Sequence, residues 1–392
     1  MPDPARVYFR DPSYDGQLVR SLSAAYADAA DIGEVFATAR RVGRPRPATW
    51  WAAWSGRADA ARASARKARE AGERVSARNA ALRACEYYRQ AFYYLRQNPA
   101  DPRLLAAYGA HVESFEDAID SMDCHAEQVR IPYDGVTLKG YFFAPDPSGT
   151  SRPTLLRPCG YDSTAEAAEA GWVGVPSALE RGYNVLVFEG PGQGEALYRH
   201  KLYFRPDFEH VLAQVVDWLL ERSDVNAKKL ALIGRSFGGY LAPRGATVEH
   251  RIAALVCDPA QPTMTDRIPG GFIRRFVPFV VNMQMRFSED RAEFFGARMA
   301  CHGLSDIRAY LEELERFKML DRASAITCPT LIIEADNDFA GGAVRSLLAA
   351  MSGAAKLVRL TKAEGADGHC AGLGQQVWEE TAYGWLEDVL AF

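Results

Sequence analysis

From residue 154 onward the chain alternates short apolar runs with segments of helical character. The runs are TLLR (154–157), NVLVF (184–188), LALIG (230–234), AALVC (253–257), TLIIE (330–334) and KLVRL (356–360). Apolar runs of this length, separated by helices, are typical of parallel strands that are buried on both faces. We therefore predict an α/β fold, with a mainly parallel twisted sheet and helices on both of its faces. Ligand sites in such sheets lie at the carboxyl ends of the strands.

The region before this alternation has a different pattern. Residues 16–122 carry Ala, Arg, Glu and aromatic residues at helical spacing, with breaks at GRPRP (43–47) and NPADP (98–102). This pattern predicts a helical domain. After it, the segment 127–145 alternates polar and apolar residues around Asp134-Gly135, which is a hairpin turn signal.

A mostly helical insertion interrupts the strand pattern later in the chain. An insertion above the strand ends is positioned to act as a cap over a ligand site. We therefore expect a helical N-terminal domain at 1–125, a first core segment at 126–261, a helical cap at 262–322 and a second core segment at 323–392.

Aromatic residues are concentrated in the N-terminal helical region. The helical spacing of Trp50, Trp51 and Trp54, and of the aromatic residues in 85–97, places them on shared faces. Such faces either line a ligand pocket or pack as core or as a subunit interface, and the sequence leaves these alternatives open.

Charge and composition exclude several classes of partner. The net charge is -4, which provides no basic field for nucleic acid and no polybasic patch for a membrane surface. No apolar run approaches the roughly 20 residues that span a bilayer, and the N-terminus lacks the pattern of a signal peptide, so we expect a cytoplasmic protein. The 7 cysteines are scattered without a C-x-x-C pair, which favours free thiols and predicts neither a metal site nor a cofactor.

The strongest chemical signal follows the run LALIG. Residues 234–238 (GRSFG) fit the pattern G-x-S-x-G, with an apolar strand before it and helix-compatible residues after it. A sharp strand-to-helix turn pushes the side chain at its centre out of the fold. Ser236 is therefore the candidate nucleophile. The alternative is a tight turn whose serine merely caps the next helix.

A serine hydroxyl needs a base to take its proton, and a histidine that follows the serine in the chain suits this architecture. Of the 7 histidines, those before Ser236 are His111, His125, His200 and His210. His250 lies near the end of the next helix and His302 lies in the insertion. His369 lies in a Gly-rich loop just after the run KLVRL, at the carboxyl end of a strand, and is the candidate base.

The base needs an acid that fixes its tautomer. Asp338 lies in the loop after TLIIE, from which a carboxylate can reach His369. Asp336 in the same loop and Asp258 at the end of AALVC are the alternatives.

A tetrahedral oxyanion needs two preorganised donors. The backbone N–H of Phe237 is one candidate. The other is the N–H of Tyr161, in the loop after TLLRPCG, where Gly160 permits a close approach.

Further polar residues are candidates for substrate binding. Asp162 follows the oxyanion loop directly and either bonds to the substrate or braces the loop. Asp258 and Asp266 are the other candidates. The segment FEGPGQGEA (188–196) lacks both the P-loop ending and the dinucleotide-binding spacing, so we interpret it as a tight loop beneath the site.

With these motifs in place, the chain resembles the α/β-hydrolase family. The segments CGYDSTAE, FEGPGQGEA, GRSFGGYLAPR, IIEADND and EGADGHCAG carry the resemblance. Within the family the chain is similar to the branch with a helical N-terminal domain, which includes dihydroxypseudooxynicotine hydrolase, fungal polyketide-shortening hydrolases and fermentation-respiration-switch proteins. The resemblance implies that Ser236, Asp338 and His369 act as nucleophile, acid and base. Cys159 stands where the family usually has the first of two glycines before the oxyanion position.

The resemblance also implies cofactor-free cleavage of a carbon–carbon bond beside a ketone. We therefore expect a serine hydrolase that acts on a small-molecule ketone or ester. One alternative is a lyase that eliminates acetate from an intermediate such as a tetronate. Another is a non-catalytic switch protein that binds a partner, and a homodimer is also left open.

Overall fold

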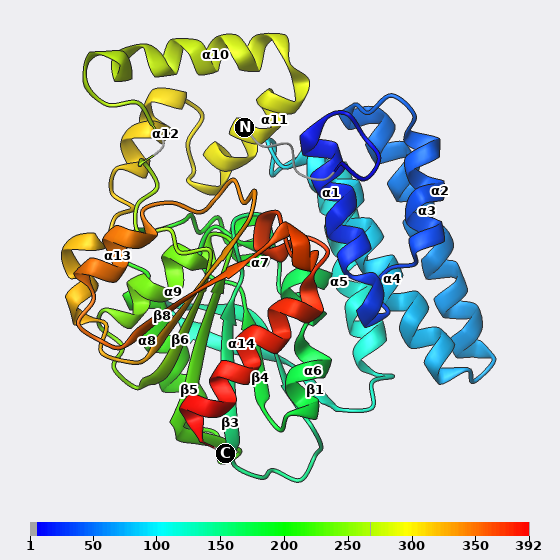
Figure 1. Cartoon of the computed structure of the whole chain (residues 1–392). Helices are drawn as coiled ribbons and strands as arrows, with labels where there is room; N and C mark the ends of the chain where they lie inside the picture. The colour runs from blue at the N-terminus through cyan, green and yellow to red at the C-terminus, as the bar shows by residue number, and fades with distance from the viewer. Residues whose placement is uncertain (1–5, 267, 392) are drawn as a thin grey trace.

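The computed structural model describes residues 6–266 and 268–391. An eight-stranded sheet in the order β1-β2-β4-β3-β5-β6-β7-β8 forms its centre (Figure 1). The strands are β1 (His125–Tyr133), β2 (Val136–Ala144), β3 (Arg152–Pro158), β4 (Asn184–Phe188), β5 (Val225–Arg235), β6 (Ile252–Asp258), β7 (Thr330–Ala335) and β8 (Ala355–Leu360).

The predicted strands and hairpin are confirmed. Strands β1 and β2 form an antiparallel hairpin that pairs antiparallel with β4, and β3 to β8 are parallel to one another. The hairpin turns at Asp134 and Gly135, which both have positive φ, as a tight two-residue turn requires. The interior strand β4 is buried along its whole length, which explains its continuous apolar run.

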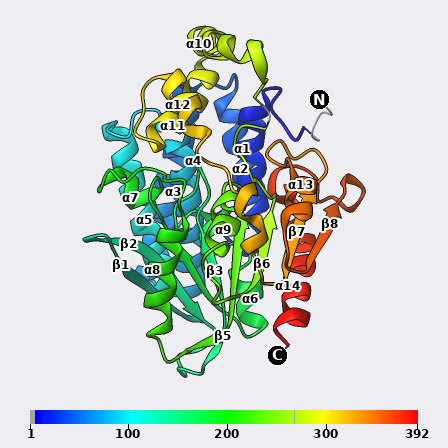
Figure 2. The ribbon, with the colours of Figure 1, turned by 90° about the vertical axis from the view of Figure 1, so that its left-hand side faces the viewer.

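Helices cover both faces of the sheet, and alternate strand residues point to each face (Figure 2). Leu155 of β3 packs on the side of α6 (Val175–Glu180) and α14 (Gln375–Leu390). Leu156 packs on the opposite side, which the remaining core helices cover. These are α7 (Gly194–Tyr198), α8 (Glu209–Leu220), α9 (Gly238–Ala246) and α13 (Val344–Ala350).

The N-terminal region is helical, as predicted. Its helices are α1 (Pro12–Ser23), α2 (Ile32–Val42), α3 (Pro47–Glu70), α4 (Arg74–Phe92) and α5 (Pro102–Ile119). They share one continuous apolar cluster with the α6 and α14 side of the sheet. Trp50 and Trp54 are fully buried in this cluster. Core packing, not a ligand pocket, therefore accounts for these two aromatic residues.

The predicted insertion is also helical. It contains η4 (Gly271–Phe276), α10 (Val277–Phe287), α11 (Glu289–Cys301), α12 (Ile307–Leu314) and η5 (Leu320–Ala325). The other short helices of the chain are η1 (Ala25–Ala27), η2 (Tyr93–Leu95), η3 (Ala168–Trp172), η6 (Lys362–Glu364) and η7 (His369–Ala371). Figure 1 shows α10, α11 and α12 at the end of the sheet where β5 and β6 finish, beside the N-terminal helices.

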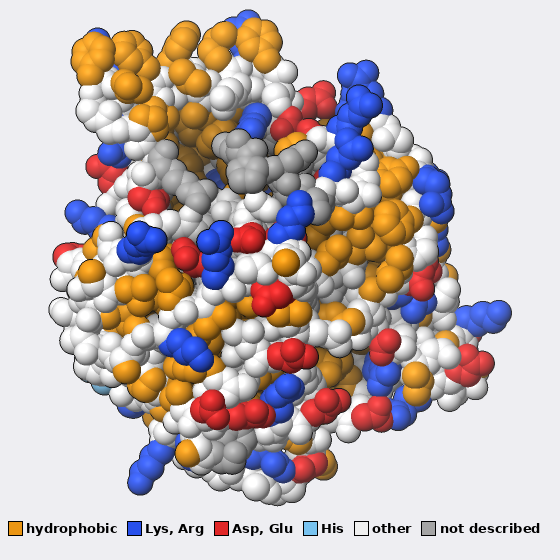
Figure 3. Space-filling model, in the orientation of Figure 1, with side chains coloured by type: hydrophobic (Ala, Val, Ile, Leu, Met, Phe, Trp, Pro, Cys, Tyr) orange, Lys and Arg blue, Asp and Glu red, His pale blue; other side chains and the backbone are white. Residues whose placement is uncertain are grey.

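The outer surface of this insertion is apolar. Figure 3 shows hydrophobic side chains gathered over α10, and Phe272, Phe279 and Phe287 are exposed there. Toward the N-terminal region, α11 makes a polar contact with the loop between η2 and α5. The backbone N–H of Gln97 donates to Glu293 at 3.1 Å.

A buried ion pair lies between the N-terminal helices and the sheet. Lys139 of β2 pairs with Glu166, and both side chains are inaccessible to solvent. The hydroxyl of Tyr141 donates to Glu166 at 2.9 Å, and His111 of α5 lies 3.9 Å from the same carboxylate. Removal of one charge from such a pair leaves the other charge desolvated and without compensation.

We expect Lys139→Met to lower the free energy of unfolding by about 3–5 kcal/mol, because Glu166 then keeps an uncompensated buried charge. Urea unfolding followed by circular dichroism measures this change. Adding Glu166→Gln removes that charge and should restore most of the loss. The exposed pair between Arg62 and Glu113 provides the control, since surface ion pairs contribute little. Equal destabilisation by Lys139→Met and Arg62→Met would contradict the expectation.

Candidate active site

The turn between β5 and α9 has the geometry that the G-x-S-x-G pattern predicts. Ser236 has φ of 56°, a strained conformation for a residue with a side chain, and its N–H donates to the carbonyl of Asp258 at 2.8 Å. A Cβ atom on Gly234 would lie 2.1 Å from the carbonyl oxygen of Gly238, so only glycine fits there. The turn therefore holds the hydroxyl of Ser236 at the carboxyl edge of the sheet.

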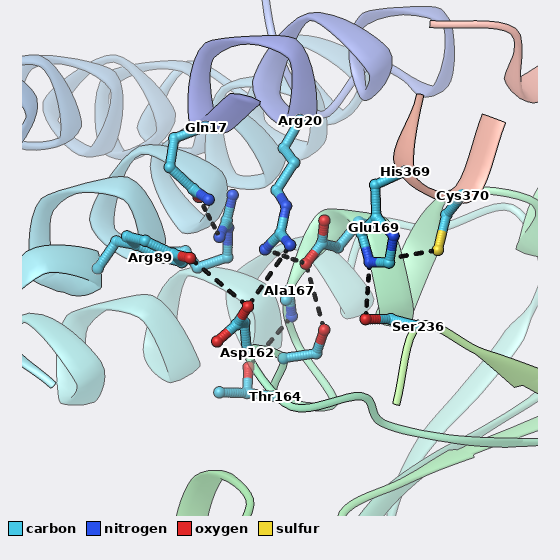
Figure 4. A network of polar contacts seen from close by, with 12 residues as sticks. Gln17, Arg20, Arg89, Asp162, Thr164, Ala167, Glu169, Ser236, His369 and Cys370 are labelled. Atoms are coloured by element: carbon cyan, nitrogen blue, oxygen red, sulfur yellow. Dashed lines mark hydrogen bonds and ion pairs between the residues drawn. The ribbon is translucent and has the colours of Figure 1, made fainter. Parts of the chain in front are cut away.

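The three residues predicted to act together are brought together. The Nε2 atom of His369 lies 2.8 Å from the Oγ atom of Ser236, and its Nδ1 atom lies 2.9 Å from Oδ1 of Asp338 (Figure 4). The order hydroxyl, imidazole, carboxylate is the one in which a carboxylate orients a base and the base takes a hydroxyl proton.

The carboxylate of Asp338 is buried and held in place. It accepts hydrogen bonds from the backbone N–H groups of Ala340, at 2.8 Å, and Cys370, at 3.2 Å. Burial alone would raise the pKa of Asp338, but His369 and these N–H groups lower it below its ordinary value. Asp338 is therefore ionised at neutral pH.

Cys370 is a neighbour of the imidazole that the sequence did not single out. Its backbone has φ of 52°, and its Sγ atom lies 3.7 Å from Nε2 of His369. Burial alone would lower the pKa of His369, but Cys370 and Asp338 raise it well above 6.5. The carboxylate of Asp338 favours the imidazolium that forms when His369 takes a proton.

The alternative acids are placed elsewhere. Asp336 accepts hydrogen bonds from Arg359, at 2.8 Å, and from the backbone N–H of Lys362. Asp258 is fully buried and pairs with Arg235 at 3.2 Å, and burial raises its pKa to about 6. Its side chain has no exposed surface in this structure, and its role in substrate binding stays a prediction.

Asp266 lies on the exposed turn before η4. Its role in substrate binding stays a prediction.

The loop after β3 passes directly beside the nucleophile. A Cβ atom on Gly160 would lie 3.6 Å from Oγ of Ser236, so the predicted close approach is present. The amide of Gln193 donates to the carbonyls of Cys159 and Gly160, at 2.5 and 3.1 Å. The segment 188–196 therefore braces this loop from below.

The backbone N–H groups of Phe237 and Tyr161 are available to a ligand. Among the residues that the structure describes, neither group donates a hydrogen bond to another part of the chain. Phe237 also stands just before the first turn of α9, where the helix dipole favours negative charge. The oxyanion role of both groups stays a prediction that this geometry allows.

The side chain of Tyr161 connects this loop to the insertion. Its hydroxyl is hydrogen-bonded to Nε2 of His302 and lies 3.3 Å from the hydroxyl of Tyr310. Burial lowers the pKa of His302 to about 3, so this imidazole is neutral. The sequence indicates only that His302 lies in the insertion, since no local pattern predicts this contact.

The carboxylate of Asp162 contacts three arginines, which fits the second of its two predicted roles, and substrate binding by Asp162 stays a prediction. Arg96 donates to its carboxylate at 2.7 Å, and Arg20 and Arg298 lie 3.5 and 3.9 Å away. Burial alone would raise the pKa of Asp162, but these guanidinium groups lower it well below its ordinary value. Sequence analysis missed the three arginines because they come from three separate segments and match no motif.

The described residues contain neither a metal-binding cluster nor a membrane-spanning helix. In the parts 6–266 and 268–391, no group of three or more His, Cys, Asp or Glu side chains could hold a metal ion. No described helix has both the length and the hydropathy of a membrane span.

Comparison with known proteins gives consistent results over most of the chain. The model of the "Alpha/beta hydrolase family" matches residues 158–382. Hydrolase LUC6 of Fusarium sp is 32% identical over 353 residues, which cover 84% of each chain. The 20-hydroxy-prefusarin hydrolase FUS2 of Gibberella moniliformis is also 32% identical over 353 residues, with the same 84% coverage of each chain.

Solved structures extend the likeness to the N-terminal helices. The crystal structure of the 2,6-dihydroxy-pseudo-oxynicotine hydrolase superposes with a TM-score of 0.74 at 22% identity, over 94% of this chain and 95% of that chain. AbyA5 superposes with a TM-score of 0.62 at 15% identity, over 91% and 94%. At these identities the likeness shows a shared fold.

Proposed function

Because the chain belongs to the α/β-hydrolase family, and because its curated relatives are named hydrolases, we propose that it is a serine hydrolase that acts on a ketone or ester carbonyl. The observation that carries the proposal is the continuous hydrogen-bonded series Ser236, His369 and Asp338 at the carboxyl edge of the sheet. The preferred reaction is cleavage of a carbon–carbon bond beside a ketone, and ester hydrolysis uses the same residues.

In the first step, Oγ of Ser236 attacks the substrate carbonyl carbon while Nε2 of His369 takes the hydroxyl proton. Asp338 accepts from Nδ1 and stabilises the imidazolium that forms. The N–H groups of Phe237 and Tyr161 bind the oxyanion, and each such donor typically contributes about 100- to 1,000-fold in rate.

In the second step, the tetrahedral intermediate collapses and the bond to the leaving group breaks. The electron pair leaves with an alcohol oxygen or an enolate, which takes the proton from His369. Water, deprotonated by His369, then attacks the acyl group on Ser236 and releases a carboxylic acid. A carbon leaving group departs only if a second carbonyl or an electron-rich ring stabilises its charge.

The elimination alternative predicts a different fate for solvent oxygen. In hydrolysis through an acyl-enzyme, one oxygen of the released acid comes from water. Elimination breaks the alkyl C–O bond after proton loss, and the released acid contains no solvent oxygen. A β-acetoxy ketone is a suitable probe, since it can follow either route.

We expect turnover of 4-acetoxybutan-2-one in oxygen-18 water to give acetate with one heavy oxygen, together with the β-hydroxy ketone. Mass spectrometry of both products measures this outcome. The same probe in buffer without enzyme corrects for spontaneous elimination, and the Ser236→Ala variant shows whether turnover needs the serine. Unlabelled acetate with an enone, and with appreciable activity in Ser236→Ala, would replace the hydrolase proposal with that of a lyase that uses His369 as base.

A further inference from the structure

Arginines from two regions outside the sheet reach the loop that carries Tyr161. Arg20 comes from α1, and Arg298 comes from α11 of the insertion. Both guanidinium groups approach the carboxylate of Asp162, which directly follows Tyr161. Figure 4 shows Arg20 between Asp162 and Glu169, with His369 and Ser236 beside Glu169.

A third arginine, Arg96, already provides the carboxylate of Asp162 with a close hydrogen bond. It donates to that carboxylate at 2.7 Å and to the carbonyl of Tyr93 at 2.9 Å, and its guanidinium lies 4.0 Å from the centre of the Tyr93 ring. Its side chain is only 7% exposed. Arg96 therefore holds the loop and has little capacity left for a ligand.

Arg20 and Arg298 have longer contacts. Arg20 lies 3.5 Å from Asp162 and 3.3 Å from Glu169. Arg298 lies 3.9 Å from Asp162, donates to the carbonyl of Phe294 at 3.2 Å, and lies 5.2 Å from the centre of the Tyr161 ring. Their side chains are 16% and 15% exposed. Each guanidinium has five N–H donors, so both can donate a hydrogen bond to a further oxygen atom.

The charges of this cluster leave a cationic surplus. Three arginines face the carboxylates of Asp162 and Glu169. The next acid, Glu293, lies near Arg96, and burial raises its pKa to about 7, so it is only partly ionised at neutral pH. Burial alone would raise the pKa of Glu169, but Arg20, Arg89 and His369 lower it. His369 therefore lies within electrostatic reach of this cluster.

We infer that Arg20 and Arg298 form a subsite for the second carbonyl oxygen of a 1,3-dicarbonyl substrate, and this inference rests on the proposed hydrolase function. When the carbon–carbon bond breaks, its electron pair moves onto that oxygen and gives an enolate. The enolate carbon then takes the proton from His369, and the acyl group stays on Ser236 until water releases it. Cations that meet a charge formed only as the bond breaks stabilise the transition state more than the ground state.

The binding test uses two rings of similar shape and different charge. 1,3-Cyclohexanedione is an acidic 1,3-dicarbonyl that is ionised at neutral pH, and cyclohexanone is its neutral counterpart. Each is measured by its protection of Ser236 against a fluorophosphonate probe, which needs no turnover. We expect the dione to bind at least about tenfold more tightly than cyclohexanone, and we expect Arg20→Met or Arg298→Met to remove that preference.

The kinetic test compares a 1,3-diketone, 1-phenylbutane-1,3-dione, with the ester 4-nitrophenyl acetate. The leaving group of the ester is 4-nitrophenolate, so its cleavage forms no enolate. We expect each arginine variant to lower the ratio of kcat/KM for the diketone over the ester by about 10- to 100-fold, mostly through kcat. Lysine at either position should restore part of the ratio. Arg57→Met is the matched control, because Arg57 pairs with Glu34 among the N-terminal helices, and its ratio should equal that of the native protein.

The outcomes separate the two proposals. Equal loss on both substrates, or no preference for the dione, overturns the subsite and leaves the hydrolase proposal standing. Native protein that hydrolyses the ester and never cleaves the diketone also overturns the subsite and leaves the hydrolase proposal standing. Native protein that neither reacts with the fluorophosphonate nor turns over any substrate overturns the hydrolase proposal, and the subsite with it.

Discussion

Ser236→Ala is expected to lower kcat for 4-nitrophenyl acetate by about 10⁵- to 10⁶-fold, because alanine has no oxygen that can attack the carbonyl and hold the acyl group. Among the described residues the hydroxyl has one hydrogen-bond partner, Nε2 of His369 at 2.8 Å, and the methyl group of alanine fits the same backbone. The midpoint of thermal unfolding should therefore change little. Steady-state kinetics and differential scanning calorimetry on the same preparations measure the two effects.

Labelling with a fluorophosphonate tests the same assignment at the level of the peptide. The native protein should carry the label on Ser236, and Ser236→Ala should carry none. Ser163 is the matched control, since its hydroxyl donates to Glu169 at 3.2 Å and has no imidazole partner among the described residues. Ser163→Ala should still be labelled at Ser236. Labelling that survives Ser236→Ala would refute the nucleophile, and a native protein that never labels would favour the partner-binding alternative.

The parts of the fold that the sequence predicted are those that local patterns determine. The central residues of the interior strands β3 to β6 are buried on both faces, so these strands contain short continuous apolar runs that the sequence makes visible. The elbow at Ser236 was predictable because a sharp turn requires specific residues at fixed positions, and chain order then led to Asp338 and His369.

The rest of the site depends on contacts between distant segments, for which a single sequence contains no signal. Arg20, Arg298 and His302 reach the oxyanion loop only because the N-terminal helices and the insertion pack beside the ends of the strands. The sequence also carried no indication of which polar side chains are buried. Asp258 ends a strand in the expected place, and its side chain is enclosed against Arg235.

The second large expected loss of activity concerns Asp338, one of the three candidate acids. Asp338→Asn is expected to lower kcat by about 10⁴-fold, because a neutral amide cannot stabilise the imidazolium and, in the orientation that donates to Nδ1, forces the proton onto Nε2 of His369. That tautomer presents a donor to Ser236 where an acceptor is needed. The loss should be smaller at alkaline pH, where hydroxide can remove the proton without the base. A pH profile of kcat/KM on 4-nitrophenyl acetate measures both features.

Asp336→Asn is the matched control for this substitution, since it removes a carboxylate from the same loop. The carboxylate of Asp336 accepts hydrogen bonds from Arg359 and from the backbone N–H of Lys362, and in the part of the chain that the structure describes it has no hydrogen bond to the imidazole. Its kcat should therefore stay within about twofold of the native value, as for a residue that only anchors a surface loop. Asp338 has both the contact with Nδ1 and the two backbone donors that fix its carboxylate against that nitrogen. Comparable losses in the two variants would mean that the shape of the loop, and not the tautomer of His369, is what the acid maintains.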